Sequence, residues 1–117
     1  MKTVLVIDDS EHMRITIKGM INDKGFNVIG EAGNGNEGVE KYKELKPDIV
    51  TMDVTMSGIN GVEALKQIVK HDPGASVIMV SAMGQDIVVK DAIMSGAKGF
   101  IVKPFSEQQI LETLGKI

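Results

Sequence analysis

Short apolar runs alternate with longer amphipathic segments along the whole chain. The apolar runs have the length and the β-branched content of strands that are buried on both faces. In order, they are Thr3–Ile7, Asn27–Ala32, Asp48–Asp53, Ser76–Val80 and Gly99–Val102. Because parallel strands need long crossover connections, this alternation predicts a parallel sheet with helices on both of its faces.

The segments that follow these runs carry the periodicity and the end signals of helices. They are residues 11–24, 37–46, 61–71, 85–95 and a last helix that begins after Ser106. Ser10 and Asn36 are the expected N-caps of the first two helices, and Ser106 with Gln109 forms a capping box for the last. The expected fold class is therefore α/β, a flavodoxin-like doubly wound (βα)5 three-layer sandwich formed by one domain over residues 1–117.

Composition excludes several classes of function. The chain has 13 Lys and Arg against 16 Asp and Glu, a net charge of −3 and only 3% aromatic residues, so it lacks the basic footprint and the stacking residues typical of nucleic-acid binding. The absence of Cys excludes thiol chemistry and favours a reducing cytoplasm. No apolar run approaches the ~20 residues that span a membrane, and Asp8 and Asp9 interrupt the first run too early for a signal peptide.

Polar residues follow four of the five predicted strands. They are Asp8 and Asp9 after the first strand, Asp53 at the end of the third, Ser81 after the fourth, and Lys103 with Pro104 after the fifth. Ligands of doubly wound sheets bind outside the carboxyl ends of the strands. The sequence therefore predicts a site in which three carboxylates, a hydroxyl and an ammonium converge on one edge of the sheet.

This set of side chains indicates phosphoryl chemistry with a hard cation. Clustered carboxylates repel one another unless a cation lies between them, and oxygen ligands without His or Cys suit Mg²⁺. A carboxylate beside Mg²⁺ can attack phosphorus, while Lys103 and Ser81 hold the remaining phosphoryl oxygens. The structural alternative makes Asp8 and Asp9 helix-entry acids, Asp53 a turn cap and Lys103 a surface residue; it requires all of them to reach the strand ends by accident.

The strings VLVIDDS, PDIVTMDVTMSGINGVEAL, VIMVSAMG and GAKGFIVKPF resemble the receiver domains of two-component response regulators, especially stand-alone chemotaxis regulators. The resemblance covers essentially the whole chain and implies the strand order 2-1-3-4-5. It implies that Asp53 is the phosphoacceptor of a histidine kinase. It also implies that Asp9, Asp53 and the backbone carbonyl of Thr55 bind Mg²⁺, while Asp8 acts through water or by orienting the site.

The resemblance further implies how the signal leaves the site. It implies that Lys103 pairs with Asp53 at rest and with the phosphoryl group afterwards, and that the Lys103–Pro104 bond is cis. It also implies that Ser81 moves toward the phosphoryl group and that Phe100 turns inward. This changes a surface formed by residues 85–95, residues 99–102 and the last helix.

The implied role is that of a monomeric phosphoacceptor that assists its own phosphorylation and dephosphorylation, rather than that of an enzyme. The implied partners are a CheA-like histidine kinase, a CheC-type phosphatase, and the flagellar motor switch or an adaptor to it. Since five βα units use nearly all 117 residues, the signal is expected to leave through the surface of the domain itself.

Four positions depart from common receiver patterns. Ser57 stands where Pro is frequent, and Phe100 replaces a frequent Tyr. Thr55 and Met83 lie where the family tunes hydrolysis, so the apolar Met83 is expected to prolong the life of the phosphoryl group. The match of residues 33–38 to G-x-G-x-x-G follows the second strand rather than the first, and a turn with a helix cap explains it.

Three alternatives remain open at this point. A phosphorelay receiver that passes its phosphoryl group to a histidine phosphotransfer protein would have the same site. A Mg²⁺-dependent aspartyl-phosphate phosphatase would need a second Asp where Thr55 stands. A flavodoxin would need a phosphate loop after the first strand, where Asp8 and Asp9 would repel the phosphate.

Overall fold

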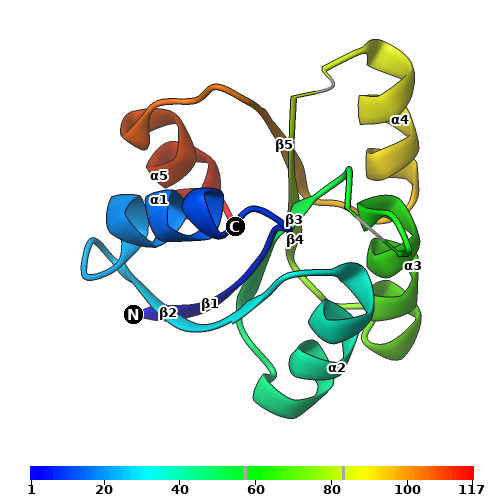
Figure 1. The fold of residues 1–117 in the computed structure, drawn as a ribbon, viewed down its shortest axis with the longest axis horizontal. Coiled ribbons are helices and arrows are strands. Elements are labelled where there is room, and N and C mark those ends of the chain that lie inside the picture. The colour runs from blue at the N-terminus through cyan, green and yellow to red at the C-terminus, as the bar shows by residue number, and fades with distance from the viewer. Residues whose placement is uncertain (57, 83) are drawn as a thin grey trace.

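The computed structural model describes residues 1–56, 58–82 and 84–117 of the chain. Five parallel strands form one sheet in the order β2-β1-β3-β4-β5 (Figure 1). The strands are β1 (Lys2–Ile7), β2 (Phe26–Ala32), β3 (Ile49–Asp53), β4 (Val77–Ser81) and β5 (Gly99–Val102). The helices are α1 (Glu11–Ile21), α2 (Gly35–Leu45), α3 (Gly61–His71), α4 (Asp86–Met94) and α5 (Glu107–Gly115). The predicted fold class and strand order are confirmed.

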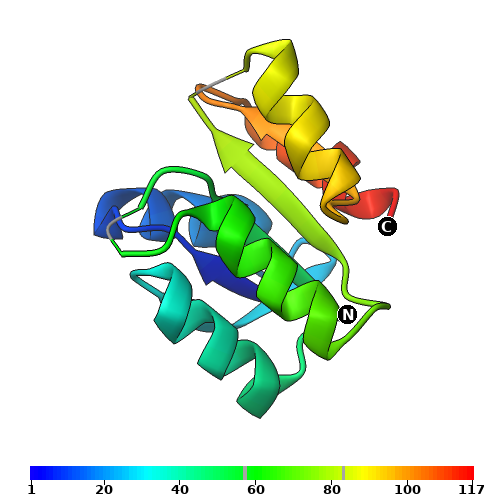
Figure 2. The ribbon, with the colours of Figure 1, turned by 90° about the vertical axis from the view of Figure 1, so that its right-hand side faces the viewer.

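The sheet is the middle layer of three, with α1 and α5 on one face and α2, α3 and α4 on the other (Figures 1 and 2). Successive strand residues point to opposite faces of a sheet, so each strand supplies both halves of the core. In β1, Leu5 and Ile7 pack on the side of α2, α3 and α4, whereas Val4 and Val6 pack on the side of α1 and α5. This two-sided burial explains why the strand runs are almost purely apolar.

Two helix ends differ from the prediction by more than one residue. The first helix ends at Ile21 rather than at residue 24, because Asn22 is extended and its side chain accepts a hydrogen bond from the Val28 backbone N–H at 3.0 Å. The second helix is capped by Asn34, whose Oδ1 accepts from the Glu37 N–H at 2.8 Å, and not by Asn36. The capping box of α5 is confirmed.

The two glycines within α2 have a packing role. A Cβ at Gly35 would lie 2.7 Å from Cγ1 of Ile59, and a Cβ at Gly38 would lie 2.5 Å from Cδ1 of Ile7. The low helix propensity of glycine is thus offset by the close approach of α2 to its neighbours. The last two glycines of the G-x-G-x-x-G match are therefore explained by the close packing of α2, which follows the turn capped by Asn34.

We expect Gly38→Ala to lower the free energy of unfolding by about 1–2 kcal/mol, because overpacking against Ile7 exceeds the gain in helix propensity. Gly19→Ala, also within a helix but with no atom within 4 Å of the added Cβ, is expected to raise it by about 0.5–1 kcal/mol. Urea unfolding of both variants checks the pair. Equal effects of the two substitutions would contradict the close packing of Gly38 on Ile7.

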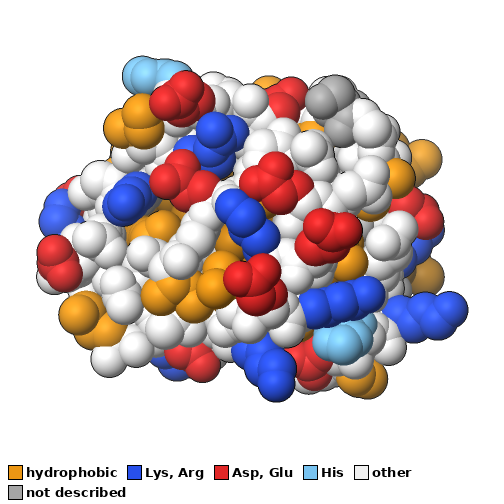
Figure 3. Space-filling view, turned by 60° about the horizontal axis from the view of Figure 1, so that its bottom comes forward, with side chains coloured by type: hydrophobic (Ala, Val, Ile, Leu, Met, Phe, Trp, Pro, Cys, Tyr) orange, Lys and Arg blue, Asp and Glu red, His pale blue; other side chains and the backbone are white. Residues whose placement is uncertain are grey.

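The surface also bears on function. Among the described residues, no helix has both the length and the apolar character needed to cross a membrane. On the face drawn in Figure 3, acidic and basic side chains are interspersed. Their charges therefore largely offset one another at that surface.

Candidate functional site

The register of the parallel strands places the polar residues that end them side by side at one edge of the sheet. Asp53 is the last residue of β3 and pairs with Val80, and Ser81 is the last residue of β4 and pairs with Val102. Asp8 follows β1 directly, and its backbone N–H donates to the Ala32 carbonyl at 3.0 Å. The strands therefore deliver these groups to the same edge of the sheet, as parallel topology requires.

Three of the predicted residues form an acidic group. Within the described ranges, carboxylate oxygens of Asp8, Asp9 and Asp53 lie within 4.8 Å of one another. Asp8 and Asp53 are buried, with exposed fractions of 1% and 6%, whereas Asp9 is exposed. A cation can therefore approach two buried carboxylates from the side on which Asp9 meets solvent.

Lys103 lies against the same group. Its Nζ is 3.0 Å from Oδ2 of Asp8 and 3.6 Å from Oδ1 of Asp53. The ammonium thus lies within ion-pair distance of Asp53, as the resemblance implied, but its shorter contact is with Asp8. The Lys103–Pro104 peptide bond is cis, which confirms that expectation.

The environment of Asp53 disfavours its charged form. Burial is the largest cause, the charge of Asp8 adds to it, and together they raise the pKa of Asp53 from its ordinary value of 3.8 to about 6. The Lys103 charge and a backbone hydrogen bond from Thr55 act in the opposite direction. The site therefore holds more negative charge than one ammonium offsets.

The donor set fits Mg²⁺. It offers only hard oxygen atoms, and a divalent cation would stabilise the charged form of Asp53, which burial and the charge of Asp8 disfavour. A bound Mg²⁺ keeps several waters, which the exposed side of the group at Asp9 and Thr55 can accommodate. The residues present are thus sufficient for a magnesium centre with open positions.

The remaining predicted residues lie around this group. Ser81 is 1% exposed, and its carbonyl accepts from the Lys103 backbone N–H at 2.8 Å. Phe100 is half-buried and packs against the core on the side of α2, α3 and α4. Thr55 is exposed beside the acidic group. Ser57 and Met83, named above as departures, lie outside the described residues.

Sequence reasoning did not single out two residues that contact the site. The Gly61 N–H donates to the Val54 carbonyl at 2.7 Å, and a Cβ at Gly61 would lie 1.9 Å from the Asp53 carbonyl oxygen. Arg14 donates from Nη1 to the Asp8 carbonyl at 2.6 Å. Two sequence features could have pointed to these residues: Gly61 is the first residue of a predicted helix, and Arg14 is the single arginine of the chain.

Comparisons with known proteins agree with this geometry. A family model described as the response regulator receiver domain matches residues 4–115. The chain is 55% identical over 116 residues to the chemotaxis protein CheY of Thermotoga maritima, covering 99% of this chain and 97% of that protein. It is 54% identical to CheY of Listeria monocytogenes, with 99% and 98% covered. A crystal structure of the CheX–CheY–BeF3–Mg²⁺ complex from Borrelia burgdorferi contains a chain with a TM-score of 0.95 and 39% identity, covering 98% of this chain and 87% of that one.

Proposed function

The chain belongs to the family of response regulator receiver domains, and on that premise we propose that it is a single-domain response regulator of chemotaxis signalling. Asp53 accepts a phosphoryl group from a histidine kinase, and the phosphorylated domain binds the flagellar motor switch or an adaptor to it. The observation that carries the proposal is the convergence of Asp8, Asp9, Asp53 and Lys103 at one edge of the sheet. Identities above 50% to CheY proteins over nearly their whole length support the chemotactic role in the cytoplasm.

The proposed chemistry needs an ionised carboxylate that can reach phosphorus. Because the pKa of Asp53 is raised only to about 6, most of the carboxyl is ionised at neutral pH. An Asp53 oxygen attacks the phosphorus of the phosphohistidine, the P–N bond breaks, and the imidazole leaves as an acyl phosphate forms. Lys103 already lies 3.6 Å from Oδ1 of Asp53, so its ammonium can offset charge on a phosphoryl oxygen.

Asp9, Asp53 and the backbone carbonyl of Thr55 are the proposed ligands of Mg²⁺, and Asp8 orients the site. When bound, the ion neutralises charge on the transferring group. Asp8 is suited to an orienting role because both of its carboxylate oxygens are engaged. Oδ1 accepts from the Ser10 backbone N–H at 2.9 Å, and Oδ2 accepts from Lys103 at 3.0 Å.

Intact-mass measurement after incubation with Mg²⁺ and acetyl phosphate tests this proposal. We expect the wild-type protein to gain one phosphoryl group and Asp53→Asn to gain none, because the amide is not a nucleophile toward phosphorus. Ser81→Ala is expected to keep the gain, since its hydroxyl acts after transfer. A chelator is expected to suppress the reaction. A gain that persists in Asp53→Asn would place the acceptor elsewhere and overturn the proposal.

The proposed docking surface consists of α4, β5 and α5. The sequence of α4 is apolar on nearly all sides, which fits either a helix packed on all sides or an apolar docking site. The side chains of Ile87, Ile93 and Met94 are exposed, whereas Ala92 is fully buried. The first explanation is therefore wrong for this helix, and the exposed residues support contact with a partner. The proposed partners are the CheA-like kinase, the CheC-type phosphatase and the motor switch or adaptor.

Beryllium fluoride with Mg²⁺, a mimic of the phosphoryl group, tests the coupling between the site and this surface. We expect it to shift the amide NMR signals of residues 94–102, because Ser81 and Phe100 link Asp53 to β5. In Ser81→Ala the same addition is expected to shift them much less while still shifting signals next to Asp53. Unchanged signals over residues 94–102 in the wild-type protein would refute the coupling.

A further inference from the structure

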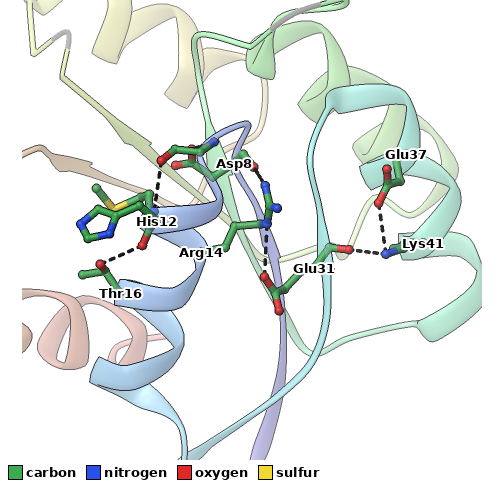
Figure 4. A network of polar contacts seen from close by, with 9 residues as sticks. Asp8, His12, Arg14, Thr16, Glu31, Glu37 and Lys41 are labelled. Carbon is green, nitrogen blue, oxygen red and sulfur yellow. Dashed lines mark hydrogen bonds and ion pairs between the residues drawn. The ribbon is translucent and has the colours of Figure 1, made fainter.

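Arg14 is the one arginine of the chain, among twelve lysines, and it lies beside the acidic group without belonging to it. It projects from α1, and its side chain is 18% exposed. Its Nη1 donates to the backbone carbonyl of Asp8 at 2.6 Å, and its Nε donates to Oε1 of Glu31 at 3.2 Å (Figure 4). The guanidinium presents its N–H donors in a rigid planar fork, whereas the three N–H donors of a lysine share one rotating nitrogen atom and fix no such geometry.

The bond from Arg14 completes the support of the Asp8 main chain. The Asp8 N–H donates to the Ala32 carbonyl at 3.0 Å, and the Asp8 carbonyl accepts from Arg14. Because the peptide unit is planar, the direction of the Asp8 carbonyl also sets the direction of the N–H and Cα of Asp9. The bond from Arg14 therefore contributes to fixing where the side chain of Asp9 begins.

Glu31 holds the other end of Arg14 in place. It lies within β2, where it pairs with Val6 of β1. Its backbone carbonyl accepts from Nζ of Lys41, which also pairs with Glu37 at 3.1 Å (Figure 4). The guanidinium is thus fixed between a strand and the turn that carries Asp8 and Asp9.

We propose that Arg14, held by Glu31, is a positioning residue for the Mg²⁺ site. It orients the Asp8–Asp9 peptide so that the carboxylate of Asp9 meets those of Asp8 and Asp53. The inference rests on the magnesium site of the proposed function.

A role of Arg14 through its charge and a role in positioning Asp9 predict opposite effects of its removal on cation binding, so an affinity measurement distinguishes the two roles. If Arg14 acted only through its charge, its removal would strengthen the binding of a cation to the acidic group. If it positions Asp9, its removal weakens that binding, although the protein loses a positive charge. Removal of groups that orient metal ligands typically lowers metal affinity 10–100-fold.

Calorimetric titration of Mg²⁺ into the wild-type protein and four variants tests the proposal. We expect the dissociation constant to rise about tenfold or more in Arg14→Ala and to change little in Lys18→Ala, which removes the same charge from the exposed side of α1. Glu31→Ala and Glu31→Gln lose the same charge, but only glutamine keeps an oxygen for Arg14. We therefore expect Glu31→Gln to bind Mg²⁺ more tightly than Glu31→Ala.

The metal-free protein offers a second readout. Because the chain has a single arginine, ¹⁵N-arginine labelling yields one Nε signal in the NMR spectrum. This signal is expected to move in Glu31→Ala and to stay in place in Lys18→Ala. The backbone amides of Asp9 and Ser10 are expected to shift in Arg14→Ala. If Arg14→Ala does not fold, the two Glu31 variants and the arginine signal decide the question.

The proposal is overturned if Arg14→Ala binds Mg²⁺ as tightly as the wild-type protein or more tightly. It is also overturned if Glu31→Ala and Glu31→Gln have equal affinities. These results are distinct from a failure of the proposed function, in which the wild-type protein itself would bind no Mg²⁺ and would gain no phosphoryl group on Asp53.

Discussion

Gly61→Ala is expected to lower the free energy of unfolding by about 3 kcal/mol or more. A Cβ at this position would lie 1.9 Å from the Asp53 carbonyl oxygen and 2.8 Å from Cα of Val54. These are main-chain atoms at the end of a central strand, so they cannot move aside as the tip of a flexible side chain can. To relieve the contact, α3 must separate from β3 or the Asp53 carbonyl must turn, and either change disturbs the acidic group.

Urea unfolding and Mg²⁺ titration of Gly61→Ala check this expectation, with Gly115→Ala as the control. Gly115 also lies at a helix end, but no atom lies within 4 Å of its added Cβ, so its stability should stay close to that of the wild-type protein. We expect the folded fraction of Gly61→Ala to bind Mg²⁺ more weakly, because Asp53 is displaced. A Gly61→Ala protein within about 0.5 kcal/mol of wild type would contradict the close approach of α3 to Asp53.

The strand-end positions could be predicted from the sequence because local patterns determine them. The apolar runs are short and bounded by polar residues, so Asp8, Asp53 and Lys103 could be assigned to strand ends without any tertiary information. Parallel topology then places those ends on one edge of the sheet. The structure brings Asp8, Asp9 and Asp53 together there, with Lys103 against two of them.

Contacts between elements distant in sequence account for what could not be predicted. α2 begins at Gly35, two residues earlier than predicted, and only the tertiary structure shows that a Cβ there would meet Ile59. The exposed side chains of Ile87 and Met94 could not be told from buried ones, because the composition of α4 fits both a buried helix and a docking helix. Arg14 acts through a backbone carbonyl, which no sequence motif encodes.

Burial of Asp53 beside the charge of Asp8 is expected to make the stability of the metal-free protein depend on pH, and Asp53→Asn is expected to remove this dependence. The pKa of Asp53 is raised from 3.8 to about 6 by burial and by the charge of Asp8. Asp53 therefore contributes most favourably to the free energy of unfolding at low pH, where its carboxyl is protonated in both the folded and the unfolded state. This contribution is lost as the pH rises through about 6. A shift of this size corresponds to at most about 3 kcal/mol. At pH 7.5, metal-free Asp53→Asn should therefore be more stable than the wild-type protein, and this advantage should shrink toward pH 4.

Asp48→Asn is the matched control, because hydrogen bonds from Thr3 lower the pKa of Asp48. A lowered pKa means that the ionised form stabilises the fold, so this substitution should destabilise the protein near neutral pH and lose its effect as the medium becomes acidic. The two Asp→Asn changes thus have opposite signs in urea unfolding at pH 7.5. Saturating Mg²⁺ should erase the advantage of Asp53→Asn, since binding stabilises the folded protein that keeps its carboxylate. If Asp53→Asn were no more stable than wild type at pH 7.5 without Mg²⁺, the inference that burial and the charge of Asp8 disfavour the ionised form of Asp53 would be wrong.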